Sequence, residues 1–305
     1  MNARLQHRAS SSRVSRARPK AAPGNHSAFD AVRRMVDGYF AKAADARKQL
    51  LEQPYTPKQL HAWRVGLRRI TATINKVTDL SDDRLEDVQA YLRACRETTG
   101  RCRDIDILVL ETLPAFLREC EVIPPPAATM QQSIMALQEQ AHTQAVAALK
   151  KVSLTMPMQS WQHWADALDP PGNERLRKSA AEIIDERFHT VIKRIAKLDG
   201  GKKRLHRLRA AIKKLRYSME LYQHQFPKRA VTRWLEQLAN LQTHFGLAHD
   251  RMMARELVAA LPLADSDRAP IKAFRKWAKK SAYEASKKAT QSLTKLGKLD
   301  LYWRT

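Results

Sequence analysis

The sequence predicts an all-α protein, and three observations lead to that fold class. Glycine is scarce, with 9 residues in a chain of 305, whereas strand-and-turn architectures use many more. Ala, Leu, Arg, Lys and Gln, which favour helices, are abundant throughout. Apolar residues recur at helical spacing between breaks at proline and glycine. Hydrophobic residues make up 44% of the chain, which is enough for a substantial core and excludes wholesale disorder.

The proline and glycine breaks divide the chain into two sets of five predicted helices. The first half, 28–151, has helices at about 28–53, 57–79, 82–99, 103–119 and 127–151. The second half, 173–297, has helices at about 174–199, 202–225, 228–245, 248–261 and 267–297. Residues 152–172 connect the halves, and the part up to 170, with Trp161 and Trp164, fits either a short helix or a packed connection. Residues 298–305 are predicted to be a C-terminal tail.

Residues 1–27 are predicted to form a disordered basic arm. They carry six basic residues and no acidic one: Arg4, Arg8, Arg13, Arg16, Arg18 and Lys20. The absence of an apolar run excludes a secretory signal peptide, while the composition also allows an organellar transit peptide. The sequence contains no window of 18 or more apolar residues, which a membrane span would need. We therefore expect no membrane partner.

The three cysteines, Cys95, Cys102 and Cys120, are odd in number and lack the C-x-x-C spacing of a metal site or a redox pair. We therefore expect buried thiols in a reducing compartment and predict a cytoplasmic protein. The formal net charge is +24, and only six of the positive charges lie in the arm. Such a charge makes a polyanion the expected partner, because binding releases counterions whatever the anion's sequence. DNA, RNA, anionic lipid and inorganic polyphosphate all fit that description.

An internal repeat relates the two halves. Residues 61–70 align without gaps on residues 206–215, which lie 145 residues later. A Gly-x-x-x-Asp signal follows each aligned histidine, and its glycine comes 39 residues later in one copy and 40 in the other. These signals run from Gly100 to Asp104 and from Gly246 to Asp250. Two separate matches at nearly one spacing predict a duplicated unit.

Each repeated segment forms a helix with an apolar back and a cationic stripe. At 100° per residue, His61, Arg64 and Arg68 lie within about 60° of one another, with Arg69 on the flank. In the second copy the same angles are taken by His206, Arg209, Lys213 and Lys214. The opposite faces are apolar: Trp63, Leu67, Ile70 and Ile74 in one copy, and Leu208, Ile212, Leu215 and Met219 in the other.

A cationic stripe is either a solvated helix face or an anion-binding surface. Like charges such as Arg64 and Arg68 at i,i+4 destabilise a helix, and residues 61–77 contain no acid to offset them. Recurrence of the stripe in a second helix favours anion binding. Its length of about 10 Å suits a run of several phosphates better than one small anion. An imidazole beside two guanidiniums is expected to be neutral until phosphate arrives.

The Gly-x-x-x-Asp signals predict a helix end followed by a new helix. Gly100 and Gly246 suit the left-handed position just after a helix. Asp104 and Asp250 would then lie in or near the first turn of the next helix, where the helix dipole favours a carboxylate. Each aspartate either caps that helix or reaches a basic residue of the His-containing helix and orients it.

These motifs resemble the CHAD family, the conserved histidine α-helical domain, over about residues 28–297. The first half carries His61-x-x-Arg64-x-x-x-Arg68-Arg69 and Gly100-Arg101-x-x-Asp104. The second half carries His206-x-x-Arg209-x-x-x-Lys213-x-Leu215-Arg216-Tyr217 and Leu241-Gln242-x-x-x-Gly246-x-x-x-Asp250. One departure is the segment 247–249, which lacks the basic residues found at Arg101 and Arg103.

The resemblance implies two pseudo-symmetric antiparallel helical bundles around a basic central groove or cavity that binds inorganic polyphosphate. It also implies an association with polyphosphate granules. The binding residues that it implies here are His61, Arg64, Arg68, Arg69, His206, Arg209, Lys213, Lys214 and Arg216. Arg187 and Arg194, seven residues apart on the preceding helix, are added because they border its apolar face.

The sequence motifs predict no enzyme, no cofactor and no metal site. There is no E-x-E-x-K motif, no Gly-rich phosphate loop, no H-E-x-x-H, and no Ser or Cys with an evident base. Asp104 and Asp106 diverge by 200° on a helix, which disfavours a shared metal.

The first alternative to a polyphosphate-binding protein is a nucleic-acid-binding or nucleoid protein, and weak nucleic-acid binding is compatible with the charge. The stripes, however, lack interleaved exposed aromatics for stacking on bases. The second rival, a polyphosphate-degrading or transferring enzyme, would need a carboxylate cluster that the sequence lacks.

Overall fold

The computed structural model describes residues 28–77, 81, 83–120, 128–169, 172–197, 202–261 and 268–305; the predicted arm at 1–27 lies outside them. The described part is all-α, as predicted, and contains no strand. Its first half contains α1 (Ala28–Glu52), α2 (Pro57–Val77), α3 (Glu86–Glu97), α4 (Gly100–Ile107), the π-helix η2 (Leu108–Thr112), α5 (Leu113–Glu119) and α6 (Ala128–Lys150). Then come α7 (Thr155–Ala167), α8 (Asn173–Ala196), α9 (Lys202–Leu221), η3 (Gln223–Gln225), α10 (Lys228–Ala259), α11 (Arg268–Leu296) and η5 (Tyr302–Arg304).

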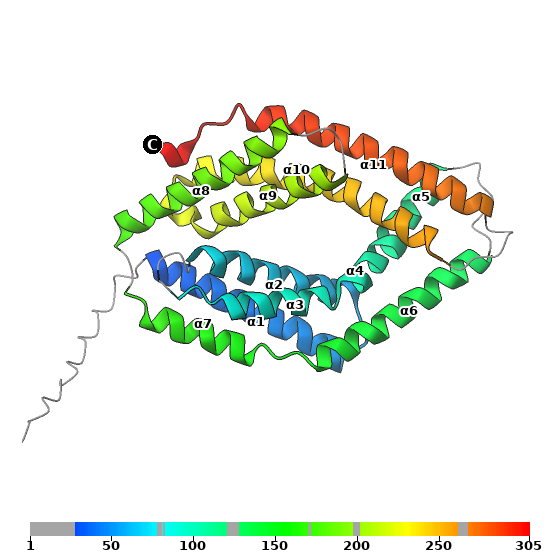
Figure 1. The fold of residues 1–305 in the computed structure, drawn as a ribbon, viewed down its shortest axis with the longest axis horizontal. Helices are drawn as coiled ribbons and strands as arrows, with labels where there is room; N and C mark the ends of the chain where they lie inside the picture. Colours follow the sequence, from blue (N-terminus) through cyan, green and yellow to red (C-terminus); the bar gives the residue numbers. More distant parts are fainter. Residues whose placement is uncertain are drawn as a thin grey trace, which may run out of the picture.

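The helices form two stacked groups that meet along α2 and α9 (Figure 1). One group holds α1, α2, α3 and α7, and the other holds α8, α9, α10 and α11. Helices α2 and α9 contact each other directly, and each also packs against its sequence neighbour, α1 or α8. Helix α5 crosses between the groups and packs on α11, where Phe116 meets Phe274 edge-on at 5.2 Å between ring centroids. The two cationic helices of the repeat are therefore neighbours in space.

The predicted apolar backs of α2 and α9 are buried. Trp63, Leu67, Ile70 and Ile74 of α2 belong to the main hydrophobic core. Leu208, Ile212, Leu215 and Met219 of α9 join the same core. Because these side chains lie on the opposite side of each helix from the basic ones, burial of the backs leaves the cationic stripes outside the core. Helix α2 begins with Pro57, whose fixed φ suits a first helical turn.

The predicted helix end at Gly246 is wrong, because α10 runs without a break from Lys228 to Ala259. Gly100, in turn, is the first residue of α4, after a short break at Thr98 and Thr99. Neither glycine has a left-handed backbone conformation. The buried face of α10 continues past Gly246 through Ala248, Ala254 and Val258, and its packing against α11 keeps the helix intact. Tertiary packing therefore outweighs the weak helix propensity of glycine.

Two segments outside the predicted helices are also ordered parts of the core. The 152–172 connection contains α7, whose Trp161 Nε1 donates to Asp37 Oδ1 at 2.9 Å. The predicted tail at 298–305 contains η5, where Trp303 is buried and its Nε1 donates to Asp185 Oδ1 at 2.8 Å. A buried tryptophan that anchors through its N–H explains why this segment packs against the fold.

The three cysteines are free thiols; Cys95 and Cys102 are buried, as predicted, and Cys120 is half-buried. Among the described helices, none is both long and apolar enough to pass through a membrane.

Candidate anion-binding cavity

A cavity of about 430 Å³ lies where α2, α3, α8 and α9 meet. Its cationic lining consists of Arg68 and Lys76 from α2, Arg93 and Arg96 from α3, Arg187 from α8, and Arg209, Lys213 and Lys214 from α9. His206 and the hydroxyl-bearing side chains of Thr71, Tyr217 and Ser218 complete much of the wall. No Asp or Glu belongs to this lining in the described part of the chain. Such an arrangement can hold an anion by charge and by hydrogen bonds together.

The structure brings six of the predicted residues together in this cavity. They are Arg68, Arg187, His206, Arg209, Lys213 and Lys214. They come from three helices and from both halves of the chain, so the cationic stripes of α2 and α9 contribute to one surface.

Arg64 lies just behind this surface and is held in place by α3 and the turn that follows it. Its Nη1 donates to Thr99 Oγ1 at 3.1 Å and to the backbone carbonyl of Arg96. Burial, followed by repulsion from Arg68, lowers the pKa of Arg64 to about 10. Burial also lowers the pKa of His61, and Arg103, Arg68 and Arg64 act in the same direction. Burial and these charges all favour the neutral form of the His61 imidazole.

The glycine of each Gly-x-x-x-Asp motif lies beside one arginine of its own half. A Cβ atom at Gly100 would lie 3.8 Å from Nη1 of Arg64, and one at Gly246 would lie 3.8 Å from Nη2 of Arg209. Each glycine thus faces the arginine that follows the repeated histidine by three residues.

The aspartate of each motif acts on the same guanidinium. The charge of Asp104 favours the protonated form of Arg64, and that of Asp250 does so for Arg209. Burial nevertheless raises the pKa of Asp104, and it raises that of Asp250 to about 6. Each carboxylate therefore acts electrostatically on the arginine of its own half. Asp250 lies in the interior of α10 and so does not cap a helix.

The cavity concentrates more positive charge than its surroundings neutralise. Burial lowers the pKa of Lys213 to about 7, and the charges of Arg209 and Arg68 contribute to the shift. Burial lowers the pKa of Lys214 and Arg96 as well. A multivalent anion in the cavity would reverse this repulsion, because each cation would then face an opposite charge.

Five of the predicted residues are not among those that line the cavity: His61 and Arg64, described above, and Arg216, Arg69 and Arg194. Arg216 Nε forms an ion pair with Glu220 Oε1 at 2.8 Å, and its Nη1 donates to Gln242 Oε1 at 3.0 Å. Arg69 Nη2 lies 3.8 Å from Glu220 Oε2, and its guanidinium lies over the ring of Tyr39 at 5.4 Å. Glu220 of α9 therefore connects to α2 through Arg69, while its ion pair with Arg216 lies within α9. Arg194 of α8 is half-buried outside this lining.

The sequence patterns did not indicate that α3 contributes to the cavity. Arg93 and Arg96 lie one turn apart on that helix and enter the cavity beside Arg68. Arg93 and Arg96 are like charges on one helix face, as are Arg64 and Arg68. Helix α3, however, carries no histidine beside them, and this pair has no repeated copy in the second half. Lys76, also missed, lies at the end of α2 and forms an ion pair with Glu186 at 3.3 Å.

A second cavity, of about 540 Å³, adjoins the first at α9, α10 and α11. His206 and Arg209 line both cavities. Lys279, Lys287 and the exposed Tyr283 of α11 lie on its far side. Cationic surface therefore extends from α3 across α9 to α11.

The CHAD domain model of protein families matches residues 34–259, which is more than half of the chain. The chain belongs to the CHAD-domain family. This confirms the resemblance seen in its His-x-x-Arg and Gly-x-x-x-Asp motifs. No curated protein matches this CHAD-domain chain in sequence.

Two solved structures resemble the fold. The CHAD domain from the plant Ricinus communis superimposes with a TM-score of 0.72 at 20% identity, covering 94% of this chain and 97% of that one. PptA from Streptomyces chartreusis superimposes with a TM-score of 0.63 at 14% identity, covering 88% of this chain and 99% of that one. At these identities the likeness concerns the helical fold alone.

Proposed function

We propose that this CHAD-domain protein binds inorganic polyphosphate in the cavity between α2 and α9, without converting it chemically. The observation that carries the proposal is the lining itself. Eight Lys and Arg side chains and His206 meet there, with no carboxylate among the lining residues of the described chain. We propose further that the protein acts at polyphosphate granules in the cytoplasm.

The cation arrangement suits a linear phosphate polymer better than a single small anion. The cations come from four helices and surround about 430 Å³, so that several phosphates must enter to neutralise them. The second cavity beyond His206 and Arg209 offers Lys279 and Lys287 to a chain that continues past α9. A polymer can follow both cavities, whereas an isolated phosphate can use only a few cations at once.

Nucleic acid is the second candidate, because duplex DNA and RNA present phosphates too. Tyr217 is the one Phe, Tyr or Trp side chain among the described residues lining the first cavity. Single-strand binding without sequence preference uses several aromatic rings for base stacking. Polyphosphate, which has no bases to accommodate, therefore fits this lining better.

A polyphosphate-cleaving enzyme is disfavoured by the same lining. Phosphoryl transfer commonly uses Mg²⁺ held by carboxylates beside the phosphates. The two nearby aspartates, Asp104 and Asp250, are instead engaged electrostatically with Arg64 and Arg209. An assay of phosphate release from long-chain polyphosphate in the presence of Mg²⁺ is expected to show no turnover.

The site assignment is tested with charge reversals of equal size at different places. Arg64→Glu with Arg68→Glu changes α2, where Arg68 lines the cavity and Arg64 is bonded to α3 and the turn after it. Lys213→Glu with Lys214→Glu changes the α9 wall. Arg229→Glu with Arg233→Glu is the matched control, because these exposed residues have the same i,i+4 spacing on α10 and lie outside both cavities. A second control, Arg13→Glu with Arg16→Glu, changes the N-terminal arm.

Each wall variant is expected to lose polyphosphate affinity by far more than either control at one salt concentration. Circular dichroism and thermal melts check that the variants fold. Equal losses in all four would mean that total charge alone governs binding, and the cavity assignment would fail. Loss of polyphosphate affinity in only one of the two wall variants would restrict the site to the helix changed in that variant.

Competition between long-chain polyphosphate and duplex DNA separates the two polyanions. At physiological salt, polyphosphate is expected to displace DNA, and DNA not to displace polyphosphate. Affinity should also fall steeply between low and physiological salt, because many phosphate contacts release many counterions. Preference for DNA in the competition would identify nucleic acid, rather than polyphosphate, as the ligand.

A further inference from the structure

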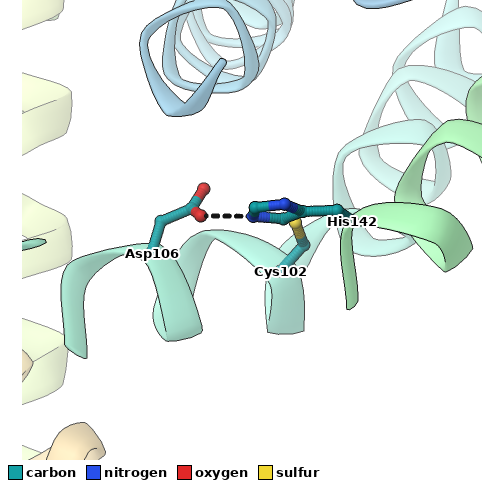
Figure 2. Close-up of side chains that lie close together, drawn as sticks. All are labelled: Cys102, Asp106 and His142. Atoms are coloured by element: carbon teal, nitrogen blue, oxygen red, sulfur yellow. Dashed lines mark hydrogen bonds and ion pairs between the residues drawn. The ribbon is translucent and has the colours of Figure 1, made fainter. Parts of the chain in front are cut away.

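A second polar cluster lies on α4, outside the lining of the anion-binding cavity, and faces α6. Cys102 and Asp106 are one turn apart on α4, and His142 reaches them from α6 (Figure 2). His142 Nε2 lies 2.9 Å from Asp106 Oδ1, and the three candidate ligand atoms all lie within 4.8 Å of one another. Asp106 is fully buried, Cys102 is 3% exposed and the His142 side chain is 24% exposed.

The donor atoms are a thiol sulfur, a carboxylate oxygen and an imidazole nitrogen. Zn²⁺ binds all three, at about 2.3 Å for sulfur and about 2.0–2.2 Å for nitrogen and oxygen. Atoms bound to one tetrahedral zinc ion are therefore some 3–4 Å apart, so the observed cluster needs only small side-chain shifts to hold the ion. The partial exposure of His142 provides an entry path from solvent.

Tyr55 supports the cluster from the segment between α1 and α2. Its hydroxyl donates to Asp106 Oδ2 at 2.7 Å and lies 3.1 Å from Cys102 Sγ, and its ring stacks on His142 at 3.7 Å between centroids. Metal-binding carboxylates are usually held by such outer hydrogen bonds. Asp106 can thus keep its bond to Tyr55 through Oδ2 while Oδ1 faces a metal ion.

We propose that Cys102, Asp106 and His142 bind one Zn²⁺ ion, with water in the fourth position and Tyr55 holding the carboxylate. Coordination releases the thiol proton of Cys102 to solvent, and His142 binds through Nε2 with its ring proton on Nδ1. Three protein ligands on two helices would tie α4 to α6.

The position of the cluster suggests what the ion does. Helix α4 packs against α2, α6 and α10, and it also carries Asp104, whose charge favours the protonated form of Arg64. A metal ion between α4 and α6 would hold Asp104 in place relative to α2. Zinc binding itself does not depend on polyphosphate binding, so either proposal can fail alone.

The wild-type chain provides the first test. Protein purified free of polyphosphate, which chelates divalent cations, is stripped with a chelator, dialysed against Zn²⁺ and analysed for metal. One tightly held zinc ion per chain is expected. Cobalt in place of zinc is expected to give thiolate-to-metal charge transfer in the near ultraviolet and the intense visible bands of a tetrahedral site. Absence of stoichiometric metal, or a cobalt spectrum without a thiolate band, overturns the proposal.

Variants locate the site. Cys102→Ala is expected to weaken zinc binding by more than about 100-fold, since loss of an outer partner alone costs about 10–100-fold. Cys95→Ala, at another buried cysteine outside the cluster, should leave zinc binding unchanged. If Cys102→Ala unfolds, comparing His142→Gln with His163→Gln makes the same test at a half-buried histidine of the cluster and an exposed histidine outside it. Zinc should raise the thermal midpoint of the wild type and of both controls, but not of the cluster variants. Equal zinc binding by cluster and control variants would mean an adventitious ion only.

Discussion

Gly246, in the interior of α10, faces the guanidinium of Arg209, and a Cβ atom at Gly246 would lie 3.8 Å from its Nη2. That separation is ordinary van der Waals contact, so the helix does not need glycine there to avoid a clash. Gly66 of α2 is different, because its Cβ would lie 2.9 Å from Cβ of Ala43 in α1. One glycine allows two helices to approach closely, and the other leaves room beside an arginine.

Gly246→Ala is therefore expected to stabilise the protein by about 0.5–1 kcal/mol, because alanine favours an α-helix. Gly66→Ala is expected to destabilise it by about 1–3 kcal/mol, because the added methyl group pushes α1 away from α2. Urea unfolding of both variants, free of polyphosphate, measures the free energies. Destabilisation by Gly246→Ala would show that the approach to Arg209 is tighter than the structure indicates.

Polyphosphate affinity is expected to rise about tenfold as the pH falls from about 8 to about 6. Lys213, with a pKa of about 7, gains a positive charge over this interval, and Asp250, with a pKa of about 6, begins to lose its negative charge. Both changes make the cavity more positive. Affinities measured at constant ionic strength with long chains, whose few terminal phosphates contribute little, test this. Lys213→Arg, which stays charged, should flatten the profile, and an unchanged slope would assign the pH dependence to another group.

Lys213→Met is expected to stabilise the polyphosphate-free protein at pH 7 by about 1–2 kcal/mol while weakening polyphosphate binding. The folded-state pKa of Lys213 is about 7, below the ordinary lysine value of 10.5. The unfolded state therefore binds a proton that the folded state releases, so stability falls as the pH drops from about 10 to about 7. The gain from Lys213→Met should shrink toward pH 10. Lys193→Met, at an exposed lysine of α8, is the control and should have little effect at either pH.

Glu220→Gln is expected to destabilise the fold by about 1–2 kcal/mol, because it leaves Arg69 and Arg216 without their shared carboxylate. Glu220 is largely buried, with 15% of its side chain exposed, so solvent screens this interaction only in part. Arg69→Ala and Arg216→Ala should likewise weaken the fold more than polyphosphate binding. Arg68→Ala, in the cavity, should show the opposite pattern. Denaturation and polyphosphate-binding curves for these four variants make the comparison. A large loss of polyphosphate affinity in Arg216→Ala would show that Arg216 belongs to the binding site.

The all-α fold and the cationic faces of α2 and α9 could be predicted because both depend on residues close together in the chain. Trp63, Leu67 and Ile70 recur at helical spacing, and the opposite face then has to carry Arg64 and Arg68. The helix end predicted at Gly246 was wrong because glycine is only a weak signal. Long-range packing of α10 against α11 decides that segment.

The sequence by itself determined the helical class, the apolar backs, the two cationic stripes and their recurrence in both halves. Only the tertiary structure decided which cations share a cavity: Arg93 and Arg96 join Arg68 and Lys213, while Arg69 and Arg216 turn to Glu220. It also brought His142 to Cys102 and Asp106. The physical reason is that helical periodicity reports which way a side chain points from its own helix. Which groups it meets there depends on the packing of helices distant in sequence, and that packing is set by the summed burial of their apolar faces.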